Sequence, residues 1–174
     1  VGLMVCDALE VKDSKIRHYA IDLGIAMQLT NICRDIKEDS AMDRVYLPKS
    51  LVGRLKSEDV SIPNKDNFKK IKICQKKLLK LADSYYKSAE FAIPFLPGKT
   101  ALAIRIASNL YQAIGKKIKN KNISYLDTRV YITKYEKFKI TLPNIFHKKK
   151  YYKKLNIHNT KLHSAIKNLP GAHN

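Results

Sequence analysis

Five polar side chains recur between Ala20 and Pro48 at spacings that place them on one side of a helix: Gln28, Asn31, Asp35, Glu38 and Asp39. At 100° per residue they fall within a stripe about 100° wide, and Lys37 points away from it. Apolar residues flank the stripe on one side: Ile25, Leu29, Ile32 and Ile36. A solvent-facing surface usually scatters Lys and Glu over its whole width. The pattern therefore predicts the wall of a polar cavity.

Asp35 and Asp39 are four residues apart, so their side chains lie one helical turn from each other. Two such carboxylates suit Mg²⁺, which prefers oxygen ligands and is typically shared between one or two carboxylates and substrate phosphates. Gln28 and Asn31 would then orient a water molecule or a diphosphate oxygen. The alternative is an amphipathic helix with an acidic end, because acid pairs at this spacing are common.

The run LGIAMQLTNICRDIKEDSAMDRVYLP resembles the second aspartate-rich motif of the squalene/phytoene synthase family, and VGLMVC at the start resembles the preceding helix. The resemblance implies an all-α, isoprenoid-synthase-type helical bundle around a central cavity. It implies catalytic roles for Asp35 and Asp39, and Mg²⁺, or alternatively Mn²⁺, held by these two residues and Glu38.

The same resemblance implies a set of substrate-binding residues: Gln28, Asn31, Arg34, Arg44, Tyr46, Tyr111 and Arg129. Each of the last four also has an ordinary interpretation. Arg44 and Arg129 could be surface arginines, and Tyr46 and Tyr111 could be packing residues. The family often has glycine where this chain has Asp43, and an acid beside Arg44 weakens the phosphate-binding interpretation of that arginine.

Helical periodicity and chain breakers predict the other elements. One long helix begins at a Ser14 cap and carries the motif, a second spans Asp66 to Ala92, and a third starts at Thr100. Residues 51–64 are expected to be a variable connection, and residues 124–139 resemble the family's closing helix. We expect residues 1–142 to be the C-terminal part of one synthase domain, incomplete at its N-terminal side, and residues 143–174 to be a poorly ordered basic tail.

The chain of 174 residues has a formal net charge of +19, but its acids are concentrated in the first 60 residues, around the motif. Lysine makes up most of the positive charge beside abundant Ile and Asn, a composition typical of an AT-rich genome. A nucleic-acid partner is therefore not predicted, and the sequence contains no recognisable DNA- or RNA-binding motif. Cys6, Cys33 and Cys74 are predicted to be buried thiols, and the five histidines form no ligand pattern.

The resemblance implies the head-to-head condensation of two prenyl diphosphates, which would be the protein's substrates. The residues of the motif most resemble those of phytoene synthases, which favours two geranylgeranyl diphosphates as substrates and phytoene as product. The reaction would pass through a cyclopropylcarbinyl diphosphate and would be the first step of carotenoid biosynthesis. One alternative is a squalene or dehydrosqualene synthase acting on farnesyl diphosphate, and only the squalene-type reaction would need NADPH. Another is a non-catalytic assembly factor with the same fold.

A second acidic motif is not found in the sequence, so we expect it in a preceding portion and expect this chain to be inactive alone. No apolar run is long enough to span a membrane, so a transmembrane helix is not predicted. We expect a cytoplasmic protein, with peripheral contact with a membrane as an alternative.

Overall fold

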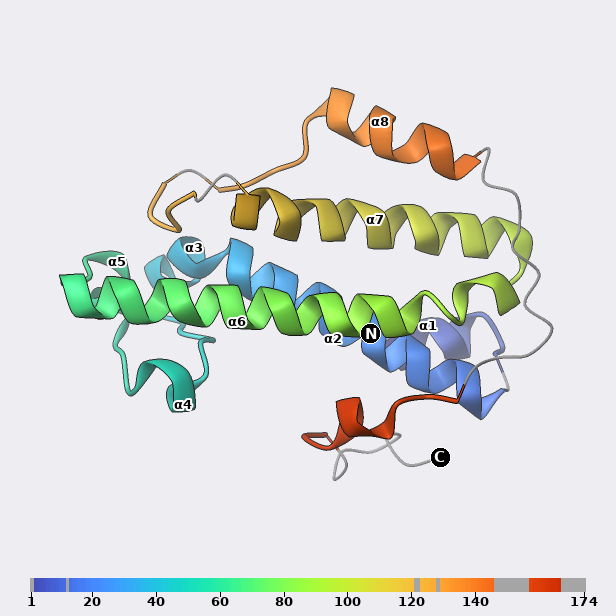
Figure 1. Cartoon of the computed structure of the whole chain (residues 1–174), viewed down its shortest axis with the longest axis horizontal. Coiled ribbons are helices and arrows are strands. Elements are labelled where there is room, and N and C mark those ends of the chain that lie inside the picture. The colour runs from blue at the N-terminus through green and yellow to red at the C-terminus, as the bar shows by residue number, and fades with distance from the viewer. Residues whose placement is uncertain (1, 12, 121–122, 128, 146–156, 167–174) are drawn as a thin grey trace.

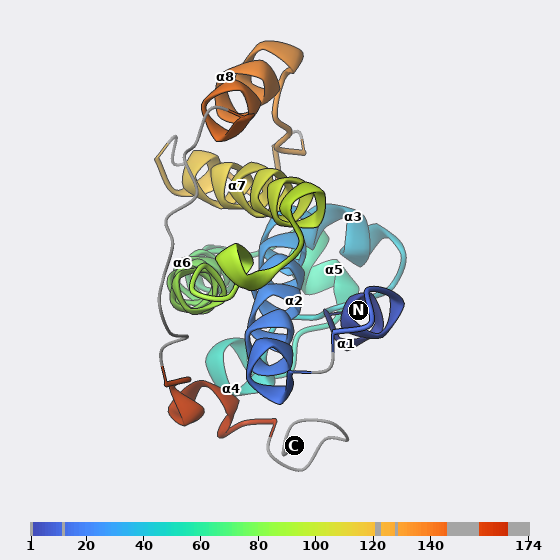
Figure 2. The ribbon, with the colours of Figure 1, turned by 90° about the vertical axis from the view of Figure 1, so that its right-hand side faces the viewer.

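The structure, a computed structural model, describes residues 2–11, 13–120, 123–127, 129–145 and 157–166. Within these ranges the chain is helical and has no β-strand, as predicted. Three long helices form the body: α2 (Ser14–Arg34), α6 (Lys65–Ala89) and α7 (Gly98–Asn120). Figure 2 shows α2 and α6 in one layer, with α7 on the next layer and α8 (Lys134–Ile145) outside α7.

Short elements join and cover the three long helices. They are α1 (Gly2–Ala8), α3 (Ile36–Ala41), α4 (Lys49–Val52), α5 (Ser57–Ser61), η1 (Ile93–Phe95) and η2 (Thr160–His163). α1 packs on α2, and α3 packs on α5 at the far end of α2 (Figure 1). The connection predicted for residues 51–64 thus contains part of α4 and the whole of α5, which are too short to show a clear sequence period.

The start of α2 differs by one residue from the prediction. Asp13, not Ser14, is the cap, because its carboxylate accepts a hydrogen bond from the Lys15 amide at 2.8 Å. Asp is as good a cap as Ser at this position. The second long helix starts with a similar device, since Asn64 accepts a hydrogen bond from the Asn67 amide.

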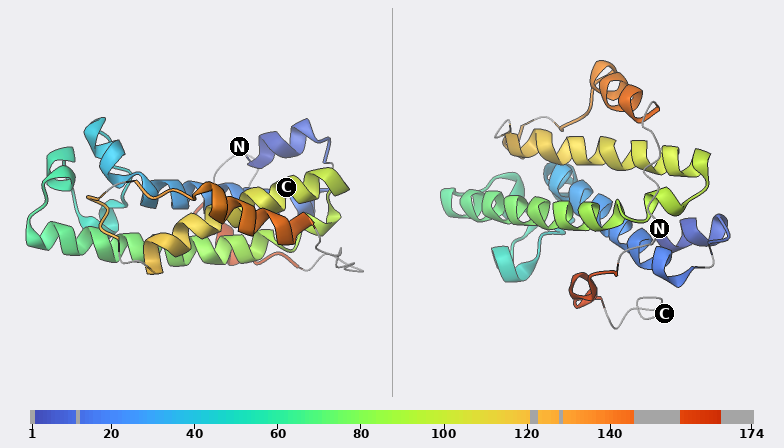
Figure 3. Two further views of the ribbon diagram at one scale, coloured as in Figure 1. Left: turned by 90° about the horizontal axis from the view of Figure 1, so that it is seen from above. Right: turned by 45° about the vertical axis from the view of Figure 1, so that its right-hand side comes forward.

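The motif does not lie on one uninterrupted helix. Asp35, with φ −104° and ψ 19°, separates α2 from α3, and Figure 3 shows α3 turned away from the axis of α2. The helical bonds from the Asp35 amide to Asn31 and from the Asp39 amide to Asp35 nevertheless remain, at 2.9 and 2.8 Å. The order of side chains along the stripe is therefore preserved across the kink.

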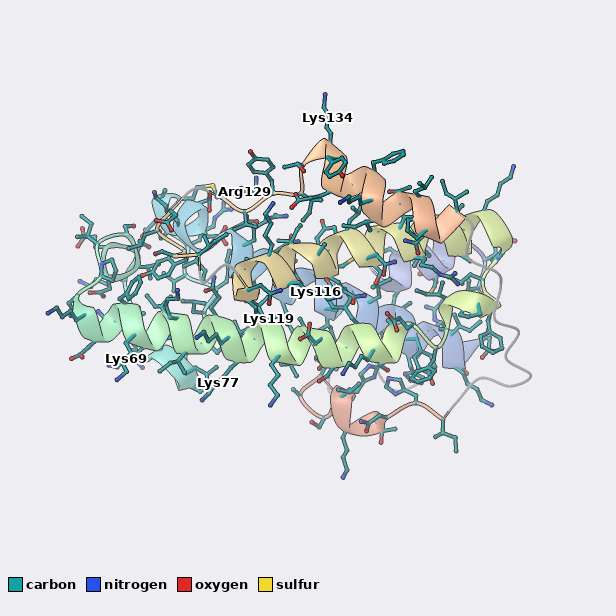
Figure 4. The ribbon with its side chains drawn as sticks, turned by 45° about the horizontal axis from the view of Figure 1, so that its top comes forward. Lys69, Lys77, Lys116, Lys119, Arg129 and Lys134 are labelled. Atoms are coloured by element: carbon teal, nitrogen blue, oxygen red, sulfur yellow. The ribbon has the colours of Figure 1, made fainter. Side chains whose placement is uncertain are left out.

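The predicted apolar stripe of α6 is confirmed as a core face. Its buried members on that stripe are Ile71, Cys74, Leu78, Ala82, Tyr85 and Ala89. Cys6, Cys33 and Cys74 are all buried and free, also as predicted. Gln75 on α6 donates a hydrogen bond to the Cys33 carbonyl at 2.8 Å, which ties α6 to α2 beside the motif. Lys69 and Lys77 project from the opposite, wet side of α6 (Figure 4).

A close approach of α1 to α2 explains one glycine. A Cβ atom built on Gly2 would lie 2.1 Å from the Ala20 carbonyl oxygen, so no larger residue fits there. The motif residue Gly24 faces the same crossing, since its own Cβ would lie 3.4 Å from the Gly2 nitrogen. Gly24 therefore contributes to the packing of α1 on α2.

The closing helix begins ten residues later than predicted. Residues 124–133, where described, are not helical, and α8 starts at Lys134. The Lys117 ammonium on α7 fixes this start by contacting the Glu136 carboxylate at 2.8 Å and the Tyr131 carbonyl at 3.1 Å. The start of this helix was predicted wrongly because similarity to the family does not show where a helix is capped. Thr133 caps it, since the Thr133 hydroxyl accepts a hydrogen bond from the Glu136 amide.

The boundary predicted after residue 142 lies inside α8, which continues to Ile145. Beyond it, residues 157–166 lie against the first half of α2, below the bundle in the view of Figure 1. The remainder of the predicted tail, residues 146–156 and 167–174, lies outside the described residues.

Candidate functional site

Asp35 is clamped between two arginines. Arg34 Nε and the Arg34 terminal nitrogen donate to its two carboxylate oxygens at 2.7 and 2.6 Å. Arg129, on the segment between α7 and α8 (Figure 4), donates to the same two oxygens at 2.8 and 3.2 Å. The structure thus brings together Arg34, Asp35 and Arg129, three residues that the sequence predicted for the site.

The charge balance differs between the two motif aspartates. Burial would raise the pKa of Asp35, but hydrogen bonds from Arg34 and Arg129 outweigh it and lower that pKa below its ordinary value. The pKa of Asp39 is raised, by burial first and then by the negative charge of Asp35. Burial and the neighbouring Asp35 carboxylate both disfavour the ionised form of Asp39, and a cation bound beside it would favour that form.

The three predicted metal ligands do not converge on one point. Among the described residues, no oxygens of Asp35, Glu38 and Asp39 form a group in which all three lie within 4.8 Å of one another. Asp35 and Asp39 still fit one half of a magnesium site, because Mg²⁺ is commonly held by one or two carboxylates together with phosphate oxygens. The role of Glu38 as a ligand stays a prediction.

Gln28 and Asn31 occupy the helix turns before Asp35. Gln28 is exposed, whereas Asn31 is half-buried and its side-chain oxygen is buried without a hydrogen-bond partner among the described residues. Between them, Thr30 belongs to the core, since its hydroxyl lies 3.0 Å from the Tyr86 hydroxyl. An unsatisfied buried acceptor is costly, so Asn31 is suited to accept a hydrogen bond from water or a ligand.

The segment carrying Arg44 and Tyr46 folds back on α3. The Arg44 amide donates to the Asp39 carbonyl at 2.9 Å, and both Arg44 and Tyr46 are exposed beside the motif acids. The reversal needs Asp43 in the left-handed region, with φ +57°, which explains why glycine suits this position in the family pattern. The Asp43 carboxylate accepts a hydrogen bond from the Ser57 hydroxyl at 2.7 Å, so it is engaged with α5.

Tyr111 on α7 is half-buried and packs against the core cluster formed by Ala26, Ala82, Tyr85 and Tyr86. Its phenol also lies close enough to Arg34 to act electrostatically on it. Tyr111 therefore combines packing with a position next to the arginine cluster.

An apolar cavity of about 230 Å³ lies along the turns of α2 that precede the polar stripe. Its walls come from α1, α2, the segment around η1 and α7, and include Val5, Leu23, Gly24, Met27, Ile93, Ile104 and Ala107. Asn31 follows Met27 by four residues and so lies on the same side of α2, one turn further along. A molecule with an apolar chain and a charged head could thus place its chain in the cavity and its head near Asp35.

A second cluster of polar side chains, formed by Asp22, His158 and His163, was not predicted from the sequence. Asp22 on α2 is fully buried, and its two carboxylate oxygens each lie 2.8 Å from the Nε2 atom of a histidine, one from His158 and one from His163. The spacing of these two histidines is visible in the sequence, but their partner is more than 130 residues away. Nothing in the local pattern of α2 identifies Asp22 as that partner.

Comparison with known proteins identifies the family to which the chain belongs. The model of the family described as squalene/phytoene synthase matches residues 1–136. The chain therefore belongs to the squalene/phytoene synthase family.

Among curated proteins, the chain is 36% identical over 137 residues to "Phytoene synthase" of Pseudescherichia vulneris, an alignment that covers 79% of this chain and 44% of that protein. It is 37% identical over 118 residues to "15-cis-phytoene synthase" of Enterobacter agglomerans, covering 68% and 40% respectively. For "15-cis-phytoene synthase" of Pantoea ananas the identity is 35%, covering 82% and 46%. The chain thus spans less than half the length of these relatives.

None of the described helices is both long and apolar enough to cross a membrane.

Proposed function

We propose that the protein carrying this chain joins two geranylgeranyl diphosphates head to head to give phytoene. The observation that carries the proposal is the order along α2 of the apolar cavity, whose lining reaches Met27, then Asn31, and then the Arg34–Asp35–Arg129 cluster at the end of the helix. At 1.5 Å per residue, Gly24 at the cavity and Asp35 at the cluster are separated by about 16 Å along the helix. This is the scale of a long isoprenoid chain with a diphosphate head.

Arg34 and Arg129 are proposed to bind the diphosphate. Guanidinium groups form paired hydrogen bonds with phosphate oxygens as readily as with carboxylates. In the structure both guanidiniums are oriented by Asp35, and the side chain of Arg129 is 53% exposed, so it can turn toward an incoming phosphate. Asp35 would then be released from part of its arginine contacts and become available to a cation.

Asp35 and Asp39 are proposed to hold Mg²⁺ together with the diphosphate, with Glu38, Gln28 and Asn31 nearby. When bound, the magnesium ion would supply the positive charge that neutralises the departing diphosphate. The chain's own contribution is to orient the phosphate through Arg34 and Arg129 and to keep water away from the apolar chain in the cavity. Exclusion of water protects the allylic cation left when the carbon–oxygen bond breaks.

The names of the three relatives support phytoene as the product, because each is called a phytoene synthase or a 15-cis-phytoene synthase. The test is to supply the full-length protein with geranylgeranyl or farnesyl diphosphate and Mg²⁺, with and without NADPH, and to identify the hydrocarbon by mass. We expect a C40 product from geranylgeranyl diphosphate without NADPH. Squalene from farnesyl diphosphate with no C40 product would contradict the proposed substrate.

Formation of no hydrocarbon from any prenyl diphosphate would instead favour the alternative of a non-catalytic assembly factor. The presence of all three motif acids argues against that alternative, because a protein without a diphosphate site has no need to place partly buried acids beside arginines at the end of a helix.

We also propose peripheral contact with an anionic membrane through α8 and the segment before it. Large exposed side chains gather there: Tyr131, Tyr135, Phe138 and Leu142. Lys134, Lys137 and Lys139 on the same helix are exposed as well, a combination that suits an anionic lipid surface. Co-sedimentation with anionic but not neutral vesicles, lost in Tyr135→Ser/Phe138→Ser, is the expected result. Equal binding by the variant would contradict this role.

A further inference from the structure

The cluster around Asp22 has the composition and spacing of a metal site, and it lies on the half of α2 away from the motif. Two histidines from η2 and the residues before it, His158 and His163, meet Asp22 inside the protein. The side chains are 8%, 7% and 0% exposed, respectively. This inference does not depend on the proposed reaction.

The donor atoms converge. One ligand atom each from Asp22, His158 and His163 lie within 4.8 Å of one another, and within the described residues this is the one group of three or more His, Cys, Asp or Glu that does so. Ligand atoms around a tetrahedral zinc ion, each bonded at about 2.0 to 2.1 Å, stand about 3.3 Å apart. The observed contacts of 2.8 Å between Asp22 and each histidine bring the donors close to that geometry.

A third imidazole lies beside these three ligands, outside the group whose donor atoms converge. His18 precedes Asp22 by four residues on α2 and so lies on the same side of the helix. Its ring centroid is 5.3 Å from that of His158 and 5.6 Å from that of His163. His158 and His163 are themselves five apart, within the H-x₃₋₅-H spacing typical of zinc ligands. One helix and one short segment thus each supply two candidate ligands.

We propose that Asp22, His158 and His163 bind a zinc-type divalent metal that fastens residues 157–166 to α2, with the ring of His18 beside the metal. The metal replaces the hydrogen bonds that the two Nε2 atoms now make with Asp22, and the ring proton of each neutral histidine then resides on Nδ1. The three ligand side chains are almost completely buried, so a substrate has no access to the metal and the site is structural, with the fourth position filled by water or by His18 after a side-chain movement. It adds to two weaker attachments of the segment, the Leu162 side chain against the core and the Tyr85 hydroxyl to the Leu162 carbonyl at 2.6 Å.

The first test is binding by the full 174-residue chain. The protein is stripped with a chelator, exchanged into chelator-free buffer and titrated with Co²⁺. We expect one Co²⁺ per chain, with the visible absorption of a tetrahedral site, and its loss when Zn²⁺ is added. An absence of stoichiometric binding, or an octahedral spectrum only, overturns the proposal.

The second test separates metal ligation from hydrogen bonding. Glutamine retains a nitrogen donor near the position of the histidine Nε2, so His158→Gln/His163→Gln can still donate to Asp22 but lacks imidazole ligands. We expect its Co²⁺ affinity to fall at least about 100-fold, the upper range for loss of partners that only support a ligand. Lys161→Ala, an exposed change on the same short helix, should bind as the parent does.

The third readout is protection of the segment itself. In the parent, Zn²⁺ should slow amide exchange of residues 157–166, and it should have no such effect in the double variant. Equal metal affinity in both proteins overturns the proposal even if the variant is less stable. If the double variant does not fold, the single variant His158→Gln and the parent's Co²⁺ spectrum give the same decision.

Discussion

Two aspartates 13 residues apart, Asp22 within α2 and Asp35 just after its end, have opposite environments. Asp22 is fully buried and faces histidines from the far end of the chain, whereas the Asp35 side chain is 17% exposed and faces arginines. A buried carboxylate needs partners that satisfy it permanently. A partly exposed one can exchange a partner such as Arg129, whose side chain is 53% exposed, when a ligand arrives. We infer that Asp22 stabilises the fold, and we propose that Asp35 serves binding and catalysis.

The largest expected effect is the loss of activity in variants of the motif aspartates. In the full-length protein, Asp35→Asn and Asp39→Asn should each reduce turnover at least about 100-fold, the scale on which charge-stabilising groups act. Phytoene formation from geranylgeranyl diphosphate is the measurement. Glu58→Gln, an exposed change on α5, is the control and should keep normal turnover. Near-normal turnover in both aspartate variants would remove the motif from the mechanism.

Stability should show the reverse order. Asp22→Ala leaves two buried histidines without their acceptor, and the free energy of unfolding should fall by about 3 kcal/mol. Asp35→Ala breaks contacts that reach solvent through Arg129, whose side chain is 53% exposed, and should cost about 1 kcal/mol. Urea denaturation in the presence of EDTA measures both without any metal contribution. Asp66→Ala, at an exposed helix start, serves as control; a smaller loss for Asp22→Ala than for Asp35→Ala would invert the comparison.

The arginine that comes from a distant segment can be tested through the pKa of Asp35. Arg129→Ala removes a hydrogen-bond donor that lowers this pKa, so the pKa should rise toward its ordinary value. Because the folded-state pKa is depressed, the stability that Arg129 contributes is present above the unfolded pKa and is lost as pH falls through the folded pKa. Carboxyl NMR titration measures the shift, with Arg54→Ala as an exposed control. An unchanged Asp35 titration would show that Arg34 alone sets it.

The position of Arg129 depends on the segment that ends at α8. The hydrogen bond from Lys117 lowers the pKa of Glu136 to about 2 from an ordinary value of 4.5. The contact should therefore support α8 above pH 4.5 and be lost as pH falls toward 2. Glu136→Gln should speed amide exchange of residues 134–145 at pH 7, while Glu90→Gln should not. Identical exchange in the parent and Glu136→Gln would mean that Asn109, which bonds Asn144 at 2.9 Å, holds α8 by itself.

The smallest effect is expected at the turn that follows the motif. Asp43→Gly relieves a left-handed conformation, worth about 1 kcal/mol, but loses the Ser57 hydrogen bond, worth about the same. The net change in the free energy of unfolding should be below about 1 kcal/mol. Asp43→Ala loses the bond without relieving the backbone and should be the less stable of the two. Equal stability of the two variants in thermal unfolding would show that the backbone conformation costs nothing here.

The sequence by itself determined the parts that depend on neighbours along the chain. The apolar stripe of α6, the helical opening that became α1, the three buried cysteines and the motif from Leu23 to Pro48 are all local patterns. Helical periodicity reports which side of a helix is apolar, and a motif reports a resemblance, whatever the rest of the chain does. For the same reason the all-helical fold and the family were predictable.

Only the tertiary structure decided which side chains meet. Arg129 reaches Asp35 across 94 residues, and His158 and His163 reach Asp22 across 136 and 141. The kink at Asp35 and the start of α8 at Lys134 were also missed, because they depend on caps and on the packing of α3 and α7. Such contacts form when α7 and the segments after it fold back along α2, and no spacing within one helix records that packing.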